Sequence, residues 1–212
     1  MAPLSWTLDL AQADPDPARL GGKAATLARL LQAGFPVLPG LVVPVSSYAR
    51  FRASAGLAGF VQGELGRRPL GELRWEELWD AALRIRARYA RAPLPGALIA
   101  ALRAELTARS APEGWAVRSS APDEDAAGHS FAGLHETILG VRGEQAVCDA
   151  LRRVWASRFS DAALLYRAEL GLSTGSGMAA LLQPISPARP AGVAFARDPR
   201  GAGGPSAQRV WV

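Results

Sequence analysis

One side chain stands apart chemically in this sequence. Lys23 is the single lysine among 24 basic residues, the other 23 being arginine, and it directly follows Gly21 and Gly22 at the expected start of a helix. Backbone amides and the positive end of the dipole at a helix start attract anions, and glycines let a ligand approach the backbone. Lysine adds a compact, mobile positive charge. The segment therefore predicts a phosphate-binding turn; the alternative is a chance position for the one lysine.

A second group of candidate phosphate ligands follows an expected strand at residues 115–118. Arg118 ends this strand, and the hydroxyls of Ser119 and Ser120 come directly after it. A guanidinium binds two phosphate oxygens at once, and hydroxyls and amides of the following loop can complete the shell. The alternative is a strand-end arginine that pairs with one of the acids at positions 123–125.

The segment 130–137 alternates small and larger residues around Gly133. A tight turn here would expose backbone amides that can cover a phosphate tail, and Thr137 would add a hydroxyl. An ordinary hairpin is the alternative for this segment.

We expect no metal ligands within this chain. The acids at positions 123–125 would suit Mg²⁺ together with substrate phosphates, but adjacent carboxylates in a loop are more often solvated. His129 and His135 have neither a cysteine partner nor the helical spacing that a zinc site needs. Cys148, the only cysteine, is expected in a helix interior as a small packing residue rather than a nucleophile.

Composition restricts the class of protein. With 212 residues, 49% of them hydrophobic, the chain can bury a sizeable core in one large domain or two small ones. The net charge of +5 would suit a nucleic-acid partner, but the arginines are scattered among acids and lack interleaved aromatic residues, so we expect none. The sequence contains neither a secretory signal nor a long apolar run. We therefore expect no membrane partner and a cytoplasmic location.

Hydrophobic periodicity predicts a largely helical first half, with a short buried strand at residues 41–43. The glycine-rich stretch 56–71 is expected to be a loop. Gly34 is expected to end the first long helix in a left-handed conformation, and Ser46 or Ser47 to cap the second helix. The expected helices cover residues 23–32, 46–53, 73–89 and 95–106.

The pattern changes after Pro112, where strands and helices alternate. The fold class predicted is α+β: a helix-rich N-terminal half followed by a small, mainly antiparallel sheet packed with helices. Strands are expected at 115–118, 131–141, 178–182 and 191–195, and helices at 147–155 and 161–171.

Taken together, these motifs resemble the N-terminal ATP-binding domain of the phosphoenolpyruvate synthase and pyruvate phosphate dikinase family, which includes rifampicin phosphotransferase. The shared segments occur in family order over roughly residues 20 to 199, and this ordered coverage is more specific than any one motif. The segments are residues 20–24, 34–40, 116–121, 124–125, 130–133, 136–137, 156–159, 166–167 and 192–193.

The resemblance implies roles for five residues. Lys23 and Arg118 would contact the phosphates of ATP. Gly133 and Thr137 would lie in the loop over those phosphates. Gln183 would stand on the strand that borders the adenine pocket.

The resemblance also implies an ATP-grasp-like fold, in which nucleotide lies between two subdomains. Residues 1–190 would form the first subdomain, and residues 191–212 would begin a truncated second one. Mg²⁺ is implied as a cofactor together with ATP, and its ligands are expected beyond Val212.

By resemblance, the function is that of the ATP-binding part of a phosphotransferase similar to phosphoenolpyruvate synthase. ATP phosphoryl groups would pass to a histidine on another domain, and then to pyruvate or a related acceptor. The partners implied are phosphohistidine-carrying and acceptor-binding domains, and the isolated chain would turn over little or nothing. The alternative is a truncated, non-catalytic nucleotide-binding or interaction module that pairs with another chain.

Overall fold

The computed structural model describes residues 5–123, 134–171, 175 and 177–187. Within these residues the chain forms one five-stranded sheet whose neighbouring strands are all antiparallel. The order across the sheet is β1 (Leu8–Asp9), β2 (Leu41–Val43), β5 (Ala179–Pro184), β3 (Trp115–Ser120) and β4 (Thr137–Val141).

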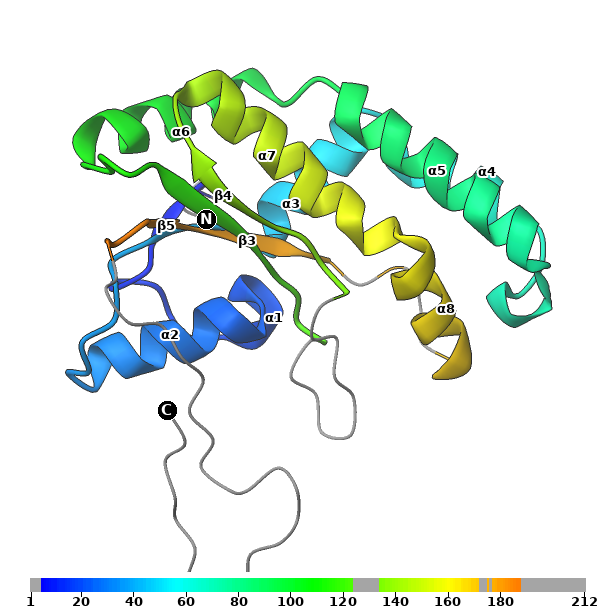
Figure 1. The fold of residues 1–212 in the computed structure, drawn as a ribbon, viewed down its shortest axis with the longest axis horizontal. Coiled ribbons are helices and arrows are strands. Elements are labelled where there is room, and N and C mark those ends of the chain that lie inside the picture. The colour runs from blue at the N-terminus through cyan, green and yellow to red at the C-terminus, as the bar shows by residue number, and fades with distance from the viewer. Residues whose placement is uncertain (1–4, 124–133, 172–174, 176, 188–212) are drawn as a thin grey trace, which may run out of the picture.

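Helices cover both faces of this sheet (Figure 1). The short α1 (Pro17–Leu20) and the longer α2 (Gly22–Gln32) lie on one face. The opposite face is covered by the remaining helices: α3 (Val45–Ser54), α4 (Leu57–Leu65), α5 (Trp75–Arg91), α6 (Gly96–Ala108), α7 (Glu144–Ala156) and α8 (Asp161–Glu169), with 3-10 turns η1 (Leu70–Glu72) and η2 (Ser157–Phe159) between them. These observations confirm the predicted α+β class.

Alternation along the strands divides the core between the two faces, because successive side chains of a strand point to opposite sides. Val42 and Leu181 are paired across the strands and pack with the alanines of α2. Val117 and Leu182 are likewise paired, and they pack on the other face. There the rings of Phe51 and Trp155 stack, and the Tyr48 and Tyr89 hydroxyls hydrogen-bond to each other, so the larger core lies beneath α3, α5 and α7.

Most expected elements are present, with two corrections in the first half. The stretch expected as a loop at 56–71 contains α4, whose Leu57, Val61 and Leu65 are buried at helical spacing. Helix α3 begins one residue after Pro44 rather than at a serine cap. The Ser47 hydroxyl donates instead to the carbonyl oxygen of Trp6, at 2.9 Å.

The other expected elements are present where the structure describes them, although some of their bounds differ. Gly34 adopts a φ of 82°, as a left-handed residue after a helix should. The two-residue strand β1 was not predicted. The expected strand 131–141 is seen as β4, which begins at Thr137, and the expected strand 191–195 lies outside the described residues.

Candidate functional site

The start of helix α2 is fixed directly to the end of strand β3. The Gly22 amide donates to the Ala121 carbonyl oxygen at 2.9 Å, and the Ala24 amide donates to the Ser120 hydroxyl at 3.0 Å. Gly21 makes this contact possible, since a Cβ on it would lie 1.9 Å from the carbonyl oxygen of Ser120. The junction therefore joins three features expected from the sequence: the paired glycines, the start of the helix and the serines after Arg118.

Lys23 is the second residue of α2 and is half-buried at this junction. The sequence placed it at the first turn of a helix, and the structure agrees. Its ammonium is close enough to His135 to lower the pKa of that imidazole. The positive charge thus lies beside the ends of β3 and β4, in addition to the positive end of the α2 dipole.

Arg118, Thr137 and Gln183 lie on the same face of the sheet as α2. Arg118 faces Thr137 on β4 and Leu181 on β5, and directly opposed residues of an antiparallel pair share a face. The Arg118 Nη1 donates to the Gln183 Oε1 at 3.3 Å. The Gln183 Nε2 donates to the Leu38 carbonyl oxygen at 2.9 Å, so this amide joins Arg118 to the 38–40 loop.

Among the five predicted ligands, Arg118 lies beside Thr137 and Gln183 on one face of the sheet, and Lys23 lies in the first turn of the helix that is fixed to the end of the same strand. Gly133 lies outside the described residues, as do His129, Glu124 and Asp125. The roles of all five in contacting nucleotide stay predictions. Asp123, one of the acids offered as a partner for Arg118, forms an ion pair with Arg167 at 2.8 Å.

A cluster of charged side chains surrounds His135, and this clustering was not predicted from the sequence. Arg158 and Arg167 are each only 1% exposed, and together with Asp123 they act electrostatically on His135. Burial, together with the charges of Arg158, Arg167 and Lys23, lowers the pKa of His135 to about 4, so its imidazole is neutral at pH 7. Burial, with Arg167 nearby, lowers the pKa of Arg158 to about 10, which leaves it charged.

Only weak signals for this cluster exist in the sequence. Arg158 and Arg167 lie in two of the shared family segments, 156–159 and 166–167, but Arg167 and Asp123 are 44 positions apart, so no local pattern showed that they would pair. His135 was expected to be structural or at the surface; it is half-buried among these charges.

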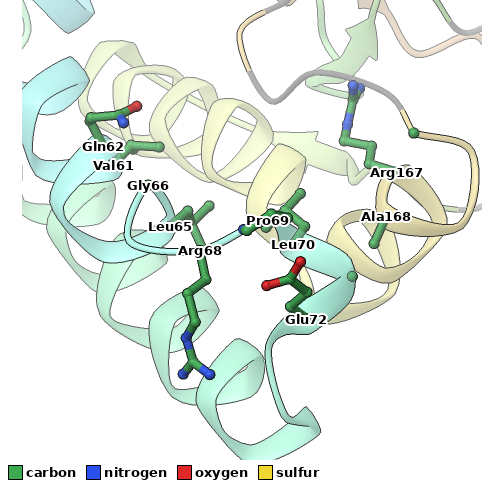
Figure 2. A pocket seen from close by; sticks show the side chains of 12 residues that line it. Val61, Gln62, Leu65, Gly66, Arg68, Pro69, Leu70, Glu72, Arg167 and Ala168 are labelled. Carbon is green, nitrogen blue, oxygen red and sulfur yellow. The ribbon is translucent and has the colours of Figure 1, made fainter.

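A hollow of about 600 Å³ opens elsewhere, between α4, the 66–72 segment and α8 (Figure 2). Leu65, Pro69, Leu70 and Ala168 line it, and the Arg167 guanidinium is turned away from Leu70. The hollow is lined by residues of α4, the 66–72 segment and α8, none of which is a predicted ligand. The hollow shares Arg167 with the charged cluster around His135, but it contains none of the predicted ligands.

Three further observations concern the described residues alone. They contain no group of three or more His, Cys, Asp or Glu side chains placed to hold a metal ion. None of their helices combines the length and apolar character that a membrane crossing requires. Cys148 is buried in α7, as expected for a packing residue, and burial raises the pKa of its thiol.

The chain is similar to several curated proteins that are longer than it is. The chain is 38% identical over 186 residues to phosphoenolpyruvate synthase of Aeropyrum pernix, covering 85% of this chain and 23% of the relative. It is 33% identical over 184 residues to rifampicin phosphotransferase of a Streptomyces species, and the match covers 86% of this chain and 21% of the relative. It is 34% identical over 184 residues to the prodigiosin synthesizing transferase PigC of Serratia marcescens, and the match covers 87% of this chain and 19% of the relative. The chain thus spans about a fifth to a quarter of these relatives.

A family model matches most of the chain. Residues 17–210 match the pyruvate phosphate dikinase AMP/ATP-binding domain. This range includes Lys23, Arg118, Gly133, Thr137 and Gln183, and it spans both the α2–β3 junction and the sheet face beside it. The chain therefore belongs to the family of pyruvate phosphate dikinase AMP/ATP-binding domains.

Proposed function

We propose that this chain binds the polyphosphate of ATP on the sheet face beside the start of α2, as the nucleotide-binding part of a phosphotransferase. The observation that carries the proposal is the junction that fixes the start of α2, where Lys23 lies, to the end of β3, the strand on which Arg118 faces Thr137. A flexible ammonium and a planar guanidinium neutralise phosphate oxygens in complementary ways. Gly133, which lies outside the described residues, completes the proposed set.

The neighbouring groups suit an anionic ligand. His135 is uncharged at pH 7, so it can lie beside the cations without adding to their mutual repulsion. Arg167 is already engaged by Asp123, at 2.8 Å. The charge directed at phosphate would accordingly come from Lys23 and Arg118, which is what phosphoryl transfer requires of a site that stabilises charge.

Gln183 has two proposed tasks. Its position on β5 suits the border of an adenine pocket, as the family resemblance implies. Its side chain also holds Arg118 and the Leu38 carbonyl oxygen at once, so it fixes the direction of the guanidinium relative to the 38–40 loop. A guanidinium held in advance loses less entropy when phosphate binds.

The further steps rest on the family and on the names of the relatives. ATP phosphoryl groups would pass to a histidine on another domain, and from there to pyruvate or a related acceptor. Mg²⁺, when bound with ATP, would neutralise phosphate charge, and its protein ligands are proposed to lie outside this chain. Residues 1–190 as the first subdomain, residues 191–212 as the beginning of the second, and a cytoplasmic location are part of the same proposal.

Calorimetry with ATP and Mg²⁺ tests the site. Replacement of Lys23 or Arg118 by alanine should weaken ATP binding by about 10- to 100-fold, since each removes a charge-assisted contact. Arg29→Ala is the matched control, because Arg29 is an exposed cation at the far end of α2. Identical heats for the native chain, Lys23→Ala and Arg118→Ala would refute the assignment.

A further inference from the structure

Helix α5 carries an apolar row on its outer side. Trp75, Trp79 and Leu83 recur every four residues and are 58%, 42% and 48% exposed. Residues four apart lie on the same side of a helix. The two indole rings stack, with centroids 6.3 Å apart and 17° between their planes. Single exposed apolar residues are ordinary on a protein surface, whereas a contiguous row of large ones marks an interaction surface.

The opposite side of α5 already serves the core of its own domain. Leu78, Ala82, Ile85 and Tyr89 are buried there. Since a whole tryptophan can bury up to about 250 Å², the exposed fractions of Trp75 and Trp79 leave about 250 Å² of aromatic residue surface in water on each copy. The outer row is therefore a second apolar surface, which the packing of the described residues leaves in water.

The charges along α5 are divided between its two halves. The first half carries Glu76, Glu77 and Asp80, and the second half carries arginines at positions 84, 86, 88 and 91. Within the chain, Glu77 pairs with Arg68 and Arg84 pairs with Glu64. An acidic first half and a basic second half are complementary to the same helix running in the opposite direction.

We propose that α5 pairs antiparallel with α5 of a second copy of this chain, about a two-fold axis near the middle of the helix. The register that centres the axis near residue 81 places Trp79 beside Leu83 of the second copy. It also places Trp75 against the small Ala87 of that copy, and Glu76 beside its Arg86. Every contact then occurs twice, as a two-fold interface requires.

The large side chains meet small ones in this register. Ala87 and Ala90 follow the row toward the C-terminal end of α5, so they leave room for the indole of Trp75 from the other copy. Arg86 is half-buried, and its Nε donates to the Ala82 carbonyl oxygen at 3.3 Å, which holds its stem along the helix. One helix pair forms a small interface, so we expect a dissociation constant on the order of 1 to 100 µM.

The proposed dimer is independent of the nucleotide site. Helices α5 and α2 cover opposite faces of the sheet (Figure 1). Pairing through α5 would leave the face with Lys23 and Arg118 open, so ATP binding and dimerisation can be measured separately.

Sedimentation equilibrium of the full 212-residue chain over a concentration series tests the interface. The native chain should show reversible dimerisation. Trp79→Glu should weaken it by on the order of 100-fold or more, because a charge would enter the centre of the interface from both copies. Phe35→Glu is the matched control, since Phe35 is an aromatic residue 57% exposed outside α5, and it should leave the dimer unchanged.

A charge exchange tests the register. Glu76→Arg alone and Arg86→Glu alone should each weaken self-association about tenfold, because like charges would meet twice. A mixture of the two variants should form a heterodimer of nearly native affinity, a result that loss of folding cannot produce. A native chain that stays monomeric at about 1 mM, a dimer insensitive to Trp79→Glu, or no recovery in the mixture would overturn the proposal.

Discussion

Gly21 touches Ser120 so closely that no side chain can be placed between them. A Cβ on Gly21 would lie 1.9 Å from the Ser120 carbonyl oxygen and 2.4 Å from its hydroxyl oxygen. Gly21 also has a φ of 74°, a conformation that residues with side chains rarely adopt. Two separate requirements, space and backbone angle, thus make glycine necessary where α2 meets β3.

Gly21→Ala should therefore destabilise the domain more than an ordinary glycine substitution. We expect a loss of about 3 kcal/mol or more, because the methyl group forces α2 away from β3 and the backbone is strained as well. Gly34→Ala is the matched control: its φ is 82°, but nothing lies within 4 Å of the added Cβ. This control should lose only about 1–2 kcal/mol. Urea unfolding measures both values, and equal losses would contradict the close contact.

His135 should make stability depend on pH. Its pKa is about 4 in the folded chain, against an ordinary value of 6.5. Between these values the unfolded chain binds a proton that the folded chain does not, so stability falls as the pH drops from about 6.5 to 4. The shift corresponds to a loss of about 3 kcal/mol.

The comparison that isolates this contribution is His135→Gln, which does not titrate. Urea unfolding of both proteins at about pH 7 and about pH 4.5, which bracket most of the titration, should give a smaller loss for the variant. If the two proteins lose equal stability, the imidazole is not protected from protonation by folding.

Arg167 should matter far more than an exposed arginine. It is 1% exposed and pairs with Asp123 at 2.8 Å, so Arg167→Met would leave a partly buried carboxylate without this partner. We expect a loss of about 3–5 kcal/mol. Arg84→Met breaks an ion pair with Glu64 of similar length, 2.9 Å, but the Arg84 side chain is 52% exposed. This control should lose less than about 1 kcal/mol by chemical unfolding.

Gln183→Leu should affect both stability and ligand binding. The substitution removes the acceptor for Arg118 and the donor to the Leu38 carbonyl oxygen at a position that is 6% exposed. A loss of about 1–3 kcal/mol is expected from the unpaired groups. If Gln183 also orients Arg118, ATP affinity should fall several-fold in the native background, and less in an Arg118→Ala background. Equal falls in the two backgrounds would rule out the orienting role.

Local pattern was enough to predict several elements, because their signals lie within a few residues. The helix at 23–32, the left-handed Gly34 and the buried strand at 41–43 are all present. Helix α4 was missed because its glycines suggested a loop. A Cβ added to Gly59 or Gly63 would meet nothing within 4 Å, so both glycines lie on the side of the helix that faces away from the core. The burial of residues 57, 61 and 65 at helical spacing stabilises the helix despite the low helix propensity of glycine.

The candidate site shows the same limit of local reasoning. The sequence singled out Lys23 and Arg118 by residue type and setting, and the register of β3 with β4 and β5 places Thr137 and Gln183 near Arg118. No local signal showed that Gln183 bonds Arg118, because the two residues are 65 positions apart. Arg158 and Arg167 lie in segments shared with the family, but their burial was not predicted, since burial depends on how distant helices pack.

The hydrogen bond from the Ala24 amide to the Ser120 hydroxyl has a consequence for the order of synthesis. The two residues are 96 positions apart, so the first turn of α2 leaves the ribosome well before the strand that binds it has been made. During that interval the helix start must rely on water for its exposed amides. The N-terminal end of α2 can thus reach its final form only late in translation, once β3 has emerged and entered the sheet.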